Sequence, residues 1–193
     1  MRVRFSDVFP LKACRYHEVT GAGSYSFAAI CCGVTSGKAI WFVEGWVPEV
    51  LNPHGLQTYC DPHRVLIGKC AGALDILAAT EESLRSGSVS LVVAELTKPL
   101  SLIAGRRLQL AAEAGSSTGL MIVREGMGSN ATQTRWSISP AYSLDDSTQM
   151  RWELNKNKAG TCGNWKVCWN DEAHRIAVVS EPAQRAHSAH KAY

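Results

Sequence analysis

Two glutamates follow apolar runs that are typical of buried parallel strands. Glu95 ends the run at residues 91–94, and Glu44 ends the run at residues 39–43. Carboxylates at the ends of such strands lie at the edge where α/β enzymes bind their ligands. There they could hold a metal ion or act as an acid and a base, and Glu95 stands where a Walker B acid would. The alternative is that both are remnants, solvated or paired with Arg124.

The phosphate-binding loop that should accompany such an acid lacks its chemistry. A P-loop reads Gly-x4-Gly-Lys-[Ser/Thr] and opens a helix. The turn after the first expected strand offers Gly21, Ala22, Gly23 and Ser24 but no lysine. The Gly-Lys pair in residues 33–38 has one residue too few between its glycines, and we interpret it as a helix-to-strand turn. Phosphoryl transfer depends on holding phosphate and metal, so we predict no catalysis and no cofactor. Residues 21–24 are then a structural turn or a residual anion site.

Four arginines form a second candidate site. Arg106 and Arg107 are adjacent, while Arg124 and Arg135 flank the glycine-rich residues 126–134. Clustered guanidinium groups bind phosphates, so these residues are candidate contacts to DNA or to a partner protein. Solvated helix faces and intramolecular ion pairs use arginine equally well, and this alternative stays open.

Length and composition point to one cytoplasmic domain. A chain of 193 residues can bury a single core. Its net charge of +3 is weaker than dedicated nucleic-acid-binding proteins usually show, so DNA contact is allowed but not demanded. Seven cysteines without a Cys-x2-Cys pair indicate reduced thiols and no metal site. No apolar run approaches the roughly 20 residues of a membrane span, and the N-terminus resembles no signal peptide.

Strand patterns alternate with helical ones, which predicts an α/β fold with a mostly parallel sheet flanked by helices. The expected strands are residues 16–20, 39–44, 65–67, 91–96 and 120–123, and the expected helices are 24–32, 75–85 and 101–115, with a broken helix in 46–59. After residue 124 the pattern changes to alternation at 135–139, 150–155 and 165–169, which predicts an antiparallel β-meander. Residues 181–193 are basic and have no apolar face, so we expect a disordered tail.

Several blocks between residues 14 and 169 resemble the ImuA family, RecA-like proteins of bacterial mutagenesis cassettes that are also described as SulA-like. The blocks are residues 17–19, 39–43, 64–67, 78–96 and 106–114. The last reads Arg-Arg-Leu-Gln-Leu-Ala-Ala-Glu-Ala and is the most specific. RecA itself is similar in its order of elements, with its Walker A loop on residues 21–26, its Walker B acid on Glu95 and its second DNA-binding loop on 126–134.

The resemblance implies a RecA-like domain over residues 14–180, preceded by an N-terminal extension at 1–13. It implies a degenerate P-loop and a vestigial nucleotide site that comprises Gly21, Ala22, Gly23, Ser24, Glu44 and Glu95. It further implies a non-catalytic accessory protein of damage-induced (SOS) mutagenesis and translesion DNA synthesis. Such a protein acts with the polymerase ImuC. We expect it to bind RecA and ImuB, which is an inactive relative of Y-family polymerases, and to bind DNA weakly. Two other functions stay open: a nucleotide sensor or ATPase completed by a partner, and a SulA-like inhibitor of the division protein FtsZ.

Overall fold

The computed structural model describes residues 3–142 and 148–180, so the tail expected at 181–193 lies outside the described residues. Within these ranges nine strands form one mixed sheet in the order β3-β2-β4-β5-β1-β6-β7-β8-β9. The first six strands run parallel to their neighbours, and β6 to β9 form an antiparallel meander. The strands are β1 (Tyr16–Thr20), β2 (Ala39–Glu44), β3 (Val65–Cys70), β4 (Leu91–Glu95), β5 (Thr118–Ile122), β6 (Thr134–Pro140), β7 (Met150–Asn157), β8 (Gly163–Asn170) and β9 (Arg175–Ser180). The predicted α/β class and the change from parallel to antiparallel pairing are confirmed.

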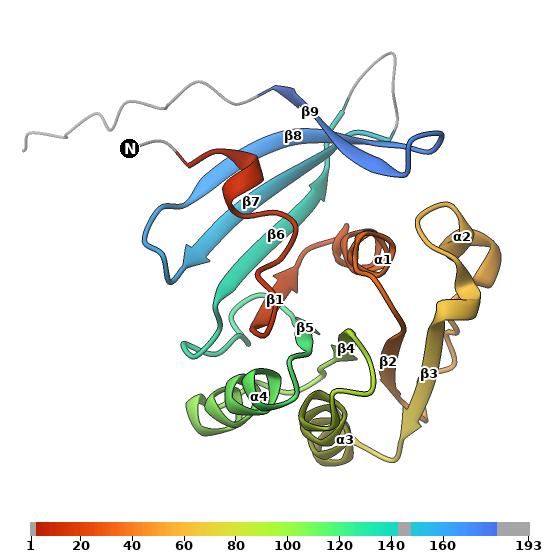
Figure 1. Ribbon diagram of the computed structural model, residues 1–193, viewed down its shortest axis with the longest axis vertical. Coiled ribbons are helices and arrows are strands. Elements are labelled where there is room, and N and C mark those ends of the chain that lie inside the picture. The colour runs from red at the N-terminus through yellow and green to blue at the C-terminus, as the bar shows by residue number, and fades with distance from the viewer. Residues whose placement is uncertain (1–2, 143–147, 181–193) are drawn as a thin grey trace, which may run out of the picture.

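Helices cover both faces of the parallel part of the sheet (Figure 1). They are α1 (Ser24–Val34), α2 (Pro53–Gln57), α3 (Ala73–Ser86) and α4 (Leu102–Ala114), with 3-10 turns at η1 (Phe5–Asp7) and η2 (Pro62–Arg64). Helix α1 packs in one apolar cluster, while α3 and α4 lie side by side in a second. Ser101 caps α4, accepting a hydrogen bond from the Ala104 amide at 3.1 Å, and Gly87 ends α3 in the left-handed conformation. All the expected helices are therefore present.

The differences from the expected elements lie at edges and ends. Strand β3 continues to Cys70 rather than ending at Ile67, because the edge strand keeps pairing with β2 through Gly68 and Lys69. Strand β9 was not predicted. Most of its side chains are exposed, so its sequence lacks the alternation of buried residues that marks an inner strand. The Gly-Lys segment at 35–38 does connect α1 to β2, as predicted.

Aromatic rings join the N-terminal segment to the meander. Phe9 lies 5.0 Å from Trp152 and 5.9 Å from Phe27 of α1, measured between ring centroids. Trp136 and Trp165 lie within the same cluster, 5.9 Å apart. The described part of the N-terminal extension thus crosses the face of β6 to β8 and closes its core (Figure 1).

Within the described residues no helix is long and apolar enough to cross a membrane. All seven cysteines are free thiols. Over the same ranges, no group of three or more metal-binding side chains could hold an ion.

Candidate functional site

The two strand-end glutamates lie at the same edge of the sheet, as their sequence pattern predicts, but the register places their side chains on opposite faces. Strands β2 and β4 are parallel neighbours, paired from Ala39 with Leu91 to Phe42 with Ala94. Glu44 and Glu95 therefore follow adjacent strands at their carboxyl ends. The chemistry of this edge depends on what each carboxylate contacts.

Glu95 is held by two aromatic donors. Its carboxylate accepts hydrogen bonds from the Tyr25 hydroxyl and from the Trp41 indole nitrogen, each at 2.7 Å. The two rings are stacked, with centroids 6.1 Å apart. Burial, and then the hydrogen bond to Glu95, raise the pKa of Tyr25, so this hydroxyl keeps its proton. Through these hydrogen bonds to Tyr25 and Trp41, both neutral, Glu95 links the first turn of α1 to β2.

Glu44 is buried and accepts a hydrogen bond from the Thr97 hydroxyl at 2.8 Å. Neither glutamate forms an ion pair with Arg124 among the described contacts, so the alternative of pairing with Arg124 has no support in the geometry. Glu49 lies close enough to Tyr25 to raise its pKa further. The carboxylates of Glu95 and Glu49 therefore both lie near Tyr25 at the start of α1, where negative charge opposes the approach of a phosphate.

The turn at residues 21–24 packs tightly beneath β6. The Gly23 amide donates to the Ile138 carbonyl at 3.1 Å, and the Ser24 amide donates to the Gly21 carbonyl at 3.1 Å. A Cβ on Gly21, whose φ is +92°, would lie 2.3 Å from the Ile138 carbonyl oxygen. A Cβ on Gly23 would lie 2.5 Å from the Ile138 side chain. The glycines are required here because another strand approaches the turn closely.

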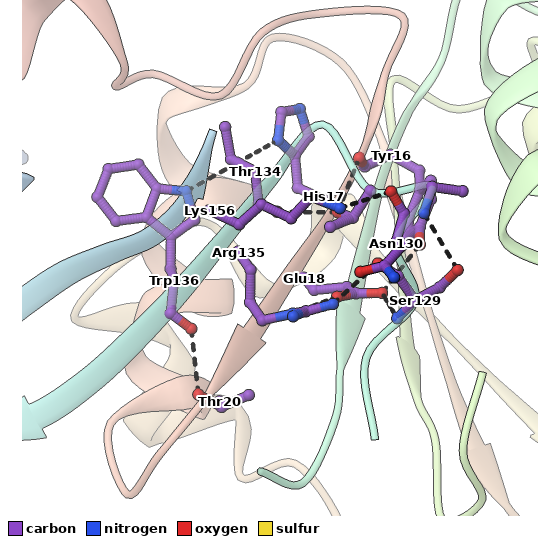
Figure 2. A network of polar contacts seen from close by, with 12 residues as sticks. Tyr16, His17, Glu18, Thr20, Ser129, Asn130, Thr134, Arg135, Trp136 and Lys156 are labelled. Atoms are coloured by element: carbon purple, nitrogen blue, oxygen red, sulfur yellow. Dashed lines mark hydrogen bonds and ion pairs between the residues drawn. The ribbon is translucent and has the colours of Figure 1, made fainter. Parts of the chain in front are cut away.

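The Arg135 side chain points toward Glu18 and Ser129 (Figure 2). Its guanidinium donates to the Glu18 carboxylate at 2.7 Å and to the Ser129 carbonyl at 2.8 Å. Glu18 is completely buried and also accepts from the Tyr16 hydroxyl at 2.9 Å and the Ser129 amide at 2.8 Å. Burial, followed by the charge of Glu18, raises the pKa of Tyr16. For Arg135 the geometry favours the alternative of an intramolecular ion pair.

A second buried chain of hydrogen bonds passes through His17. The ring lies 2.6 Å from the Thr134 hydroxyl through Nδ1 and 2.9 Å from the Lys12 carbonyl through Nε2. Because a carbonyl only accepts, Nε2 carries the proton of a neutral ring. Trp136 donates its indole hydrogen to the same Thr134 oxygen at 3.0 Å (Figure 2). Burial lowers the pKa of His17 to about 4.

Sequence reasoning missed Glu18 and His17 as parts of a site. The available signal was their place in a strand that we expected to be buried, because ionisable residues are buried only with partners. What the sequence could not supply was the partner strand, which lies 117 residues further along the chain.

The remaining arginines do not gather with Arg135. Arg107 forms an ion pair with Glu81 of α3 at 2.7 Å, and its side chain is 65% exposed. Arg106 and Arg124 are exposed, and their guanidinium groups make no hydrogen bond or ion pair with the described residues. Contact of Arg106 or Arg124 with DNA or a partner stays a prediction.

No protein-family model matches the chain. The chain is similar to proteins named "Protein ImuA" from two strains of Caulobacter vibrioides, and each is 28% identical. The match covers 82% of this chain and 76% of each relative.

Proposed function

We propose that the chain is a member of the ImuA family and a non-catalytic accessory protein of damage-induced mutagenesis and translesion synthesis, which its 28% identity to two proteins named "Protein ImuA" supports. It acts by binding the ImuB-type polymerase relative, and RecA is a further proposed partner. The mixed α/β sheet is compatible with the RecA-like ancestry proposed from the sequence. Fold and family alone do not assign an activity, whereas the contacts made by the residues of the candidate site bear on it directly.

The packing of residues 21–24 beneath β6 carries the non-catalytic part of this proposal. Two amides of this turn already donate to carbonyl oxygens of Ile138 and Gly21. A nucleotide-binding loop needs such amides free, together with a lysine for the phosphate charge. The turn has no lysine, and Tyr25, the residue that follows it, donates to the Glu95 carboxylate, a group that repels phosphate. These features support a scaffold that works through its surfaces.

Nucleotide titration tests the non-catalytic part. The purified full chain is titrated with ATP and Mg²⁺ in a calorimeter, first alone and then with the ImuB-type protein of the same bacterium. We expect no binding heat in either case. Binding that appears only with the partner would instead favour a nucleotide site completed by the partner.

Copurification tests the partner part. The tagged chain is isolated from cells treated with a DNA-damaging agent, and the eluate is probed for the ImuB-type protein and for RecA. We expect at least the ImuB-type protein, and absence of both would contradict the proposal. In a parallel assay, FtsZ polymerisation should be unaffected by the chain, whereas inhibition would support a SulA-like function.

A further inference from the structure

Helices α3 and α4 border an apolar groove on the surface of the protein. The groove has a volume of about 480 Å³. Its lining includes Leu77, Leu96, Leu100, Ala104 and Leu108. Three of these leucines are almost fully buried, so the floor is a fixed part of the core. The two helices pack side by side through apolar residues, and the Glu81–Arg107 ion pair described above also links them.

Two large apolar side chains lining this groove project into water. Leu74 of α3 is 81% exposed and Ile103 of α4 is 73% exposed. Single exposed apolar residues are common, but two beside an apolar groove form a patch of the kind that marks a protein interface. A nucleic acid binds chiefly through its phosphates, which gain little from contact with leucine and isoleucine side chains. A protein segment is therefore the better occupant of the groove.

The charge around the groove indicates which charge the bound segment should carry. Lys98 and Arg107 line it, and its one lining carboxylate belongs to Glu81. Glu81 is already neutralised, because it pairs with Arg107 at 2.7 Å and with Arg85 at 2.5 Å. The rim therefore carries an excess of positive charge, which complements carboxylates on a partner.

We infer that this groove docks a short segment of the partner protein in which apolar side chains are flanked by aspartate or glutamate. The apolar side chains would cover Leu74 and Ile103, and the carboxylates would face Lys98 and Arg107. This inference rests on the proposed function, since it assigns the segment to the ImuB-type protein.

Calorimetry of the full chain with the purified ImuB-type protein tests the assignment. Leu74→Asp and Ile103→Asp should each weaken binding at least about tenfold, because each places a carboxylate at the centre of the apolar contact. Leu110→Asp is the matched control: Leu110 is 64% exposed on the same helix but lies outside the groove lining, so its affinity should equal that of the wild type. Lys98→Glu should also weaken binding, and raising the salt concentration should weaken the wild-type complex. Thermal melting of each variant checks that it is folded, and Lys98→Glu tests the groove even if an apolar variant does not fold.

The outcomes separate the two proposals. If the wild type does not bind the ImuB-type protein, the proposed function fails, and this inference with it. If the wild type binds and the groove variants bind as well as Leu110→Asp does, the docking site is wrong while the proposed function stands. Loss of self-association or of DNA binding in the groove variants, with partner binding intact, would equally overturn the inference.

Discussion

Burial of the His17 ring makes the stability of the fold depend on pH between 7 and 5. In the folded protein the ring is fully buried and its pKa is lowered to about 4, from an ordinary value of 6.5. Below pH 6.5 the unfolded chain therefore takes up a proton that the folded protein does not. Acid thus favours the unfolded state, and stability falls as the pH decreases from 6.5 towards 4.

The size of the effect follows from these two pKa values. Between pH 7 and pH 5 the unfolded histidine passes from mostly neutral to almost fully charged, while the buried ring stays neutral. Linkage then gives a loss of about 2 kcal/mol in the free energy of unfolding from this one residue. A loss of this size is a large fraction of the 5–15 kcal/mol typical of whole proteins.

Urea unfolding of the wild type and of His17→Gln, followed by tryptophan fluorescence at pH 7 and pH 5, measures the effect. The substitution itself costs stability at both pH values, because glutamine cannot reproduce both contacts of the ring with Thr134 and Lys12. Glutamine does not titrate, however, so the variant should lose about 2 kcal/mol less than the wild type between the two pH values. All other titrating groups contribute to both proteins and cancel in the comparison. Equal losses in the two proteins would contradict this prediction, since they would mean that His17 can be charged in the folded state.

Three further substitutions test the contacts around β1 and the core. Arg135→Met should destabilise the fold by about 3–5 kcal/mol in urea unfolding, since it leaves the Glu18 carboxylate buried without its cation. The control is Arg124→Met at an exposed position, which should change stability by less than about 0.5 kcal/mol. Phe9→Ala should cost about 3–5 kcal/mol in the same assay, and a negligible loss would mean that the N-terminal segment does not pack on the meander. Gly21→Ala should lower the melting temperature by several degrees. The added Cβ introduces backbone strain and clashes with the Ile138 carbonyl of β6, which together should cost about 1–3 kcal/mol. An unchanged melting temperature would show that β6 does not cover the turn.

The sequence predicts well those features that depend on local periodicity and on the rules of parallel sheets. The apolar runs before Glu44 and Glu95 place both residues at the carboxyl edge, because parallel neighbours end on the same side. The alternation of polar and apolar residues after residue 124 predicts three of the four antiparallel strands. It does not predict the exposed edge strand β9.

Features that depend on distant pairing could not be predicted in the same way. Nothing near Arg135 in the sequence indicates that its guanidinium pairs with Glu18, because the two meet only when β6 joins β1. The same pairing explains the glycines at 21 and 23, which look like a phosphate turn until Ile138 is found against them. Glycines in a sequence indicate that another group approaches the backbone closely, but they do not identify that group.

The central position of β1 also has a consequence for the growing chain on the ribosome. This strand is made first, yet its neighbours β5 and β6 come roughly a hundred residues later, with His17 and Thr134 separated by 117 positions. At a synthesis rate of roughly 5–20 residues per second, β6 follows β1 after about 6–23 seconds. During that interval β1 has neither of its neighbouring strands, so Glu18 has no Arg135 beside it. The buried ion pair of Glu18 and Arg135 can therefore form only after most of the sheet has been synthesised.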